Sequence, residues 1–193
     1  NNCHSLRTPQ WAADAIQRWT GKAPEGFQKF AKAFHAGTTG APGARGALLA
    51  LIDDKSQPAL VRASAIDRLR PWMTPTMLPA VSRALNDPDA SVRLAAVENL
   101  AAADQPTRVR YLPRMLGDPV RAVRIEAARA LAGPPESGIV PDDRARFEAA
   151  LAEYIAVQRY NADRPEGRMN LGQLQATRGD DQAAIAEYRR VAG

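Results

Sequence analysis

Three arginine residues, Arg62, Arg93 and Arg124, recur at an interval of 31 residues. Each guanidinium carries five N–H donors in a planar fork, and this geometry suits carboxylate and phosphate groups. A row of such side chains along a groove could therefore bind an anionic partner. The structural alternative is that each arginine bonds an aspartate in a turn between helices, such as Asp87 or Asp118, and links one repeat to the next.

Each arginine opens one copy of a recurring segment, and the copies lie at residues 60–69, 91–100 and 122–131. A Val-Arg pair comes first in each copy, a small residue follows three positions after the arginine, and leucine closes the segment. A fixed period of this size indicates a stacked array, in which no single unit buries its own apolar face. A small residue at a helix interface lets two helices approach closely. The small residues here are Ala65, Ala96 and Ala127.

Apolar residues at helical spacing predict a series of helix pairs between residues 41 and 135. The sequence therefore predicts an all-α protein, a right-handed α-solenoid of helical hairpins. The pattern resembles HEAT repeats, although their usual period of about 40 residues is longer than the period here. That resemblance favours the structural role for the arginines. The expected pairs are 42–53 with 58–70, 74–86 with 90–102, and 107–116 with 121–132.

A different period follows in residues 136–193. Residues 150–154 recur 34 residues later as 184–188, which is the spacing of tetratricopeptide (TPR) repeats. We expect a Pro-rich linker at 134–143, a long helix from about 142, and a TPR-like array that is incomplete at its end. Gly172 would allow close helix approach. By resemblance, Asn170 stands where TPR proteins often touch a ligand.

The chain begins Asn1-Asn2-Cys3-His4, and Cys3 is its only cysteine. One further cysteine directly before Asn1 would complete Cys-x-x-Cys-His, the attachment motif for c-type haem. In that motif two thioethers fix the porphyrin and the histidine ligates the iron. The structural alternative is that Cys3 and His4 form a frayed terminus.

A helix with tryptophans at both ends, Trp11 and Trp19, should follow, starting at Thr8-Pro9 and stopping at Gly21. Cys3-His4, this helix and the two kinds of repeat together resemble bacterial multihaem c-type cytochromes, in which the haem domain runs into HEAT-like and then TPR repeats.

The resemblance implies that residues 1–40 trail a truncated haem motif, and that the chain starts inside a longer protein. In the intact protein, Cys3 would be the second thioether cysteine and His4 the proximal ligand of haem c. The resemblance also implies export to the periplasm, and without it a cytoplasmic location is expected. His35 could be a distal ligand, or an ordinary histidine placed favourably at a helix C-terminus.

The chain carries a net charge of +5, and residues 105–135 alone carry +4. That stretch could meet nucleic acid, but no aromatic side chains interleave its arginines and Asp118 and Glu126 interrupt them. Trp72 could be an exposed interaction anchor, or could cap the gap between stacked helix pairs. The sequence contains no run of apolar residues long enough to cross a membrane.

No catalytic triad, phosphate loop or metal cluster stands out in the sequence. We therefore expect a non-catalytic protein-binding scaffold, the repeat portion of an exported multihaem cytochrome, with an unidentified protein partner. Two alternatives remain: a stand-alone HEAT/TPR adaptor without haem, and nucleic-acid binding through the basic 105–135 face.

Overall fold

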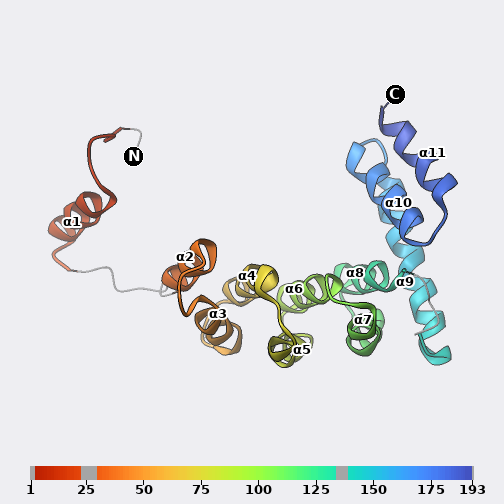
Figure 1. Cartoon of the computed structure of the whole chain (residues 1–193), viewed down its shortest axis with the longest axis horizontal. Helices are drawn as coiled ribbons and strands as arrows, with labels where there is room; N and C mark the ends of the chain where they lie inside the picture. The colour runs from red at the N-terminus through yellow and green to blue at the C-terminus, as the bar shows by residue number, and fades with distance from the viewer. Residues whose placement is uncertain (1–2, 23–29, 134–138, 193) are drawn as a thin grey trace.

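The computed structural model describes residues 3–22, 30–133 and 139–192, and within these ranges it contains helices and no strand (Figure 1). The prediction of an all-α solenoid of helical hairpins is confirmed. The helices are α1 (Pro9–Thr20), α2 (Ala31–Thr39), α3 (Ala44–Asp53), α4 (Ala59–Leu69), α5 (Leu78–Ala84), α6 (Ala90–Ala101), α7 (Gln105–Tyr111), α8 (Arg121–Leu131), α9 (Pro141–Tyr160), α10 (Pro165–Thr177) and α11 (Asp181–Ala192).

Helix α1 has the boundaries that its sequence predicts. The Thr8 hydroxyl accepts a hydrogen bond from the backbone N–H of Trp11 at 3.2 Å, and Pro9 occupies the first turn, where it costs no hydrogen bond. Gly21 ends the helix with a φ of 72°, a conformation that favours glycine. In Figure 1 this helix stands apart from the others.

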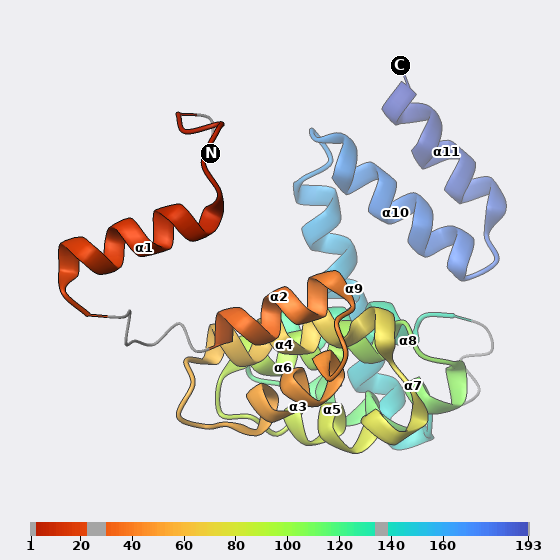
Figure 2. The ribbon, with the colours of Figure 1, turned by 60° about the vertical axis from the view of Figure 1, so that its left-hand side comes forward.

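The array consists of two layers of helices. Helices α2, α4, α6 and α8 lie side by side in one row, which we call the inner row, and α3, α5 and α7 form the outer row (Figures 1 and 2). Between the rows lies a continuous apolar core, and burying each large aliphatic side chain there contributes about 1.5–3 kcal/mol. Its fully buried members include Leu48, Ile66, Leu85, Leu100, Leu112 and Val123.

Helix α2 packs on α3 and α4, although the sequence suggests a boundary near residue 40. A Cβ atom on Gly37 would lie 3.1 Å from the Leu48 side chain, so the glycine permits this close approach. The Arg68 guanidinium also covers the ring of Phe34 at 4.2 Å. The N-terminal end of the array therefore includes α2 as well as the expected pairs.

Two of the expected helices are shorter than predicted, because proline interrupts them. The expected helix 74–86 begins as a 3₁₀ turn at Pro75–Met77 and becomes α-helical only at α5. The expected helix 107–116 ends at Tyr111 and continues as a 3₁₀ segment from Pro113 to Gly117. Proline has no N–H to donate and clashes with the preceding turn, so an α-helix does not pass through it.

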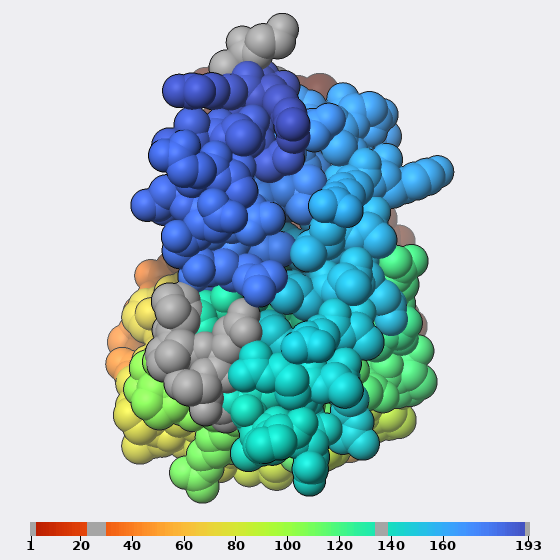
Figure 3. Space-filling view, turned by 90° about the vertical axis from the view of Figure 1, so that its right-hand side faces the viewer, coloured from red at the N-terminus to blue at the C-terminus, as the bar shows by residue number. Residues whose placement is uncertain are grey.

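Helix α9 packs against α8 at the end of the array, and the hairpin of α10 and α11 rises above it (Figure 3). The expected long helix and the expected helix pair after it are therefore both present. A Cβ atom on Gly172 would lie 2.3 Å from the Tyr188 ring, so α10 and α11 approach each other at this glycine as predicted. The expected linker at 134–143 falls partly outside the described residues.

Candidate partner-binding pocket

The three arginines of the repeat form ion pairs along the array. Arg93 donates from Nε to Asp118 Oδ2 at 2.7 Å and from Nη2 to Asp118 Oδ1 at 3.0 Å. Its Nη1 also donates to the backbone carbonyl oxygens of Asp87 and Pro88, at 2.9 and 3.0 Å. One arginine thus joins the turns before α6 and α8, which is the structural role considered from the sequence.

Arg62 forms the equivalent pair one repeat earlier, with Asp87, and both side chains are buried. Lys55 Nζ donates to the same carboxylate at 2.6 Å. Burial alone would raise the pKa of Asp87, but hydrogen bonds from Arg62, Lys55 and the Asp89 N–H outweigh that effect. The pKa of Asp87 is consequently lowered from 3.8 to about 2.

The third pair differs from the first two. Arg124 donates from Nε and Nη2 to the two carboxylate oxygens of Glu153, at 3.0 and 2.7 Å, and Arg121 lies 3.1 Å from the same residue. Glu153 belongs to α9, and the sequence period did not indicate it. The ladder therefore anchors α9 to the array. It also occupies all three arginines with carboxylates of the same chain.

A second row of arginines has the same spacing and was missed from the sequence. Arg83 Nη2 lies 2.9 Å from a carboxylate oxygen of Asp53, and Arg114 Nη2 donates to the Ser82 carbonyl at 2.9 Å. Arg83 and Arg114 are also 31 residues apart, so a search of the sequence for every recurring arginine would have found them.

The small residues of the repeat lie in the core. Ala65, Ala96 and Ala127 each have 0% exposed surface, on neighbouring helices of the inner row. The contacts of α4 with α6 and of α6 with α8 run past these positions. Such contacts suit a residue without a long side chain, since interiors are closely packed. These residues support the spine and are not available to a partner.

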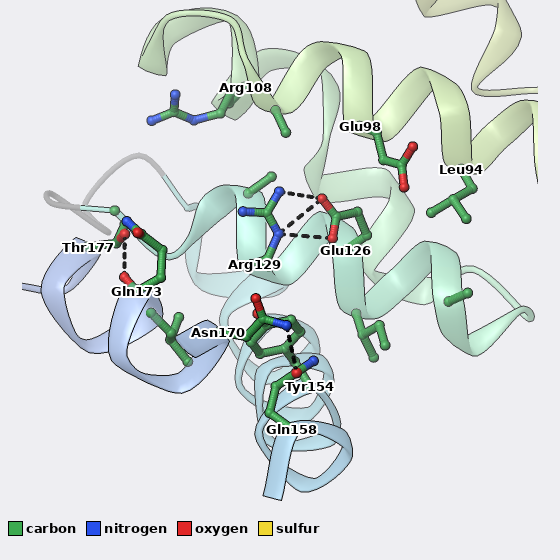
Figure 4. Close-up of a pocket in the computed structure, with 16 residues that line it drawn as sticks. Leu94, Glu98, Arg108, Glu126, Arg129, Tyr154, Gln158, Asn170, Gln173 and Thr177 are labelled. Atoms are coloured by element: carbon green, nitrogen blue, oxygen red, sulfur yellow. Dashed lines mark hydrogen bonds and ion pairs between the residues drawn. The ribbon is translucent and has the colours of Figure 1, made fainter. Parts of the chain in front are cut away.

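A pocket of about 510 Å³ lies where the inner row meets the C-terminal helices (Figure 4). Its walls come from α6 and α8 on one side and from α9 and α10 on the other. This is the size of pocket that takes a small ligand or part of a peptide. The side chains that line it include Leu94, Glu98, Arg108, Ile125, Glu126, Arg129, Tyr154, Gln158, Asn170, Gln173, Leu174 and Thr177.

The array side of the pocket carries charged groups. Arg129 and Glu126 form a two-point ion pair, with Arg129 Nε 2.9 Å from Glu126 Oε2 and Arg129 Nη2 2.5 Å from Oε1. Glu98 has a looser environment, because its nearest cation among the described residues is Arg70 Nη2 at 3.9 Å. Burial raises the pKa of Glu98, and the negative charge of Glu126 raises it further.

The C-terminal side of the pocket carries neutral polar groups. Asn170 Nδ2 donates to Gln158 Oε1 at 3.0 Å across α10 and α9. Figure 4 shows these two amides beside Tyr154, a buried residue whose pKa burial raises. Side-chain amides both donate and accept, so they suit the backbone of an extended peptide. Asn170, which we considered from the sequence by resemblance, therefore lies in this pocket.

Cys3 and His4 lie outside this pocket, before α1. Cys3 is a free, exposed thiol, and the ring centroid of His4 lies 5.0 Å from that of Trp11. These two residues could supply one thioether and one iron ligand, whereas the attachment motif needs a second thiol that the described residues do not contain. The fit of these residues to haem is thus partial.

The other residues considered from the sequence occupy structural positions. His35 is exposed on α2. Trp72 is half-buried, with its ring 3.2 Å from the place where Gly40 would carry a Cβ atom, and Arg45 lies 5.9 Å from the ring centre. Trp72 therefore closes the gap beside the end of α2, which is the capping role rather than that of an exposed anchor.

The arginines of the basic 105–135 stretch bond extensively to groups of the same chain. Arg108 donates to the Ala103 carbonyl at 2.6 Å, while Arg121, Arg124 and Arg129 pair with glutamates. Arg110 lies 5.3 Å from the centre of the Tyr111 ring. Because a phosphate-binding face needs guanidinium groups that are free to leave their partners, the structure does not favour the nucleic-acid alternative.

Comparison with known families gives a match over the same helices. A family model described as HEAT repeats matches residues 46–132 and 77–153, which together span more than half of the chain. The chain belongs to the HEAT-repeat family. No curated protein and no solved structure matches it.

Proteins built of HEAT repeats are typically non-catalytic scaffolds that bind other proteins, and the pocket lies between two HEAT-repeat helices and the helices that follow. Two searches of the described residues agree with a scaffold. No group of three or more histidine, cysteine or acidic side chains could hold a metal ion there. No described helix is both long and apolar enough to cross a bilayer.

Proposed function

We propose that this HEAT-repeat chain is a protein-binding scaffold, and that the pocket between α6, α8, α9 and α10 is where it holds a segment of its partner. The observation that carries the proposal is the lining of the pocket. Aliphatic, charged and amide side chains from four helices converge on about 510 Å³. A peptide needs these three kinds of group for its apolar side chains, its charged side chains and its backbone.

The Arg–Asp ladder supports the proposal indirectly. Because Arg93 and Arg62 are held by buried aspartates, the array is a rigid support, and the Arg124–Glu153 pair fixes α9 against α8. A binding site whose walls are fixed before the partner arrives loses less conformational entropy on binding. Gln173 and Asn170, in contrast, are exposed on α10 and can contact a partner directly.

Photo-crosslinking in the native host tests this function. A photoreactive phenylalanine analogue at Gln173, inside the pocket, should give a discrete adduct with one protein. The same analogue at Glu148, an exposed position of α9 that does not line the pocket, is the matched control. Equal and diffuse labelling from both positions would contradict the proposal.

A finer proposal concerns the C-terminal helices, which we infer to be TPR-like. Ala150 and Ala184, which are 34 residues apart, are both buried, and α10 and α11 form a hairpin around Gly172. These features support a TPR-like unit that continues the solenoid. A chain shortened after Tyr160 tests it: in a solenoid the array should remain folded, with a lower unfolding temperature.

The finest proposal places the scaffold in an exported, periplasmic multihaem c-type cytochrome. Its support is the exposed thiol of Cys3 next to His4, directly before the tryptophan-bearing helix α1. The full-length protein, produced in a periplasm, should show the absorbance bands of covalently attached haem, and Cys3→Ser should weaken them. A full-length protein without such bands would instead be an adaptor without haem.

A further inference from the structure

The carboxylate of Glu98 differs from the other charged groups of the pocket in its lack of a close partner. Its side chain is 43% exposed, and Arg70 Nη2 lies 3.9 Å away, beyond hydrogen-bond distance. That same nitrogen lies 2.9 Å from Asp67, so Asp67 is its closer partner. Among the described residues, Glu98 therefore has an acceptor capacity that no donor of this chain fills.

The neighbouring charges do not compete for this role. Both oxygens of Glu126 accept from Arg129, as described above, and Arg108 donates to the Ala103 carbonyl. In Figure 4, Arg108 lies at the opposite end of the pocket from Glu98. A ligand that enters beside Glu98 thus meets a negative group first, with a fixed ion pair behind it.

The surroundings of Glu98 suit a long side chain with a charged end. Leu94 lies beside Glu98 in Figure 4, and Ile125 lines the same pocket. Lysine and arginine bury their aliphatic stems on apolar surface while the charged head finds a carboxylate. A neutral side chain would leave the Glu98 carboxylate desolvated without compensation, which disfavours such a ligand.

We infer that the pocket selects a basic side chain, arginine or lysine, of the partner segment, and that the Glu98 carboxylate is its acceptor. This inference rests on the proposed function, because it names the chemistry of the segment that the pocket holds. The side chain would extend past Leu94 toward Glu98. The amides of Gln158 and Asn170, on the opposite wall, would face the backbone of the segment.

Selection from a library of random linear peptides tests the inference and does not require that the partner be identified first. The full chain is the target, and peptides that still bind Gln173→Trp are discarded, since that indole would fill the pocket. The remaining peptides should share one arginine or lysine. A synthetic peptide from this set is then measured by fluorescence polarisation against the wild type, Glu98→Gln and Glu148→Gln.

The expected result is that Glu98→Gln weakens binding about tenfold or more, because a charge-assisted hydrogen bond is lost. Replacing the basic residue of the peptide by norleucine should weaken binding similarly, and the two changes together should add little further loss. Glu148→Gln, the same chemical change outside the pocket, should leave affinity unchanged. Glu98→Lys should bind a peptide whose basic residue is changed to glutamate better than it binds the original.

Two outcomes would contradict these statements, and they can be told apart. Peptides that are blocked by Gln173→Trp but share no basic residue, or that bind Glu98→Gln as tightly as the wild type, would overturn the role of Glu98 and keep the pocket as the binding site. A selection that yields no peptide sensitive to Gln173→Trp would overturn the pocket as a peptide-binding site, and the inference with it.

Discussion

Arg93 and Asp118 form a two-point ion pair that joins consecutive repeats, with side chains that are 12% and 4% exposed. The carboxylate of Asp118 also accepts from the Val120 N–H at 2.8 Å, at the turn before α8. One buried carboxylate therefore shapes a turn and receives the arginine of the preceding repeat. Asp87 has the same two roles one repeat earlier, toward Asp89 and Arg62.

Arg93→Ala should destabilise the fold by about 3–5 kcal/mol, because Asp118 would be left buried without its partner. Arg83→Ala is the matched control, since its pair with Asp53 is exposed (59% and 53%) and should contribute less than about 1 kcal/mol. Urea unfolding measures both values. Equal losses in the two variants would contradict the structural role of the ladder.

The double change Arg93→Met with Asp118→Asn adds a second check of the same pair. Asparagine can still accept from the Val120 N–H, and neither charge remains buried alone. The double variant should therefore be more stable than the two single losses predict when added. A purely additive result would indicate that Arg93 and Asp118 do not act as a pair.

The stability of the array should depend on pH through Asp87. Its pKa is lower in the folded chain than in the unfolded chain, so the ionised form stabilises the fold. That contribution, about 2 kcal/mol, is complete above the ordinary pKa of 3.8 and is lost as the pH falls toward about 2. Unfolding free energies of the wild type and Asp87→Asn should differ most at neutral pH and converge in acid. A difference that does not change with pH would contradict this assignment.

Gly172→Ala should destabilise the C-terminal hairpin by about 1–3 kcal/mol, because the new methyl group would meet the Tyr188 ring. Gly46→Ala is the control, since it lies in α3 with no atom within 4 Å of the added carbon. That change should stabilise the fold by about 0.5–1 kcal/mol. Amide exchange should place the effect of Gly172→Ala in α10 and α11, and its cost should vanish when Tyr188 is also changed to alanine.

Glu98→Gln should leave the unfolding temperature at neutral pH unchanged or raise it. Burial and Glu126 raise the pKa of Glu98, so its ionised form opposes folding, and this cost falls as the pH decreases through the raised pKa. Thermal unfolding of Glu98→Gln beside Glu148→Gln checks the sign. A clear loss of stability specific to Glu98→Gln would show that Glu98 supports the fold and is not reserved for a ligand.

The sequence predicts much of the array and little of the pocket. The 31-residue recurrence of Arg93 predicts both a repeat and a possible bond to Asp118, because residues at equal positions in stacked units meet equal neighbours. The partner of Arg124 could not be found this way. The position equivalent to Asp118 in the next unit is Ala149, and the carboxylate comes instead from Glu153, one helical turn further along α9.

The pocket was not predictable because its walls belong to different kinds of repeat. Glu98 and Arg129 share one position of the 31-residue period, whereas Gln158 and Asn170 lie in helices with another period. Their distance in space depends on the angle at which α9 crosses the end of the array, and no local pattern encodes that angle. The helix breaks at Pro75 and Pro113, in contrast, follow from proline chemistry and could have been predicted.

The measurement that tests the central claim most directly is the affinity of the crosslinked partner segment for pocket variants. Isothermal titration calorimetry would compare the wild type, Gln173→Trp and Glu148→Trp. Both positions are exposed, so both variants should unfold at the temperature of the wild type. If the pocket is the binding site, Gln173→Trp should abolish binding and Glu148→Trp should bind like the wild type. Unchanged binding to Gln173→Trp would contradict the assignment of the pocket as the partner-binding site.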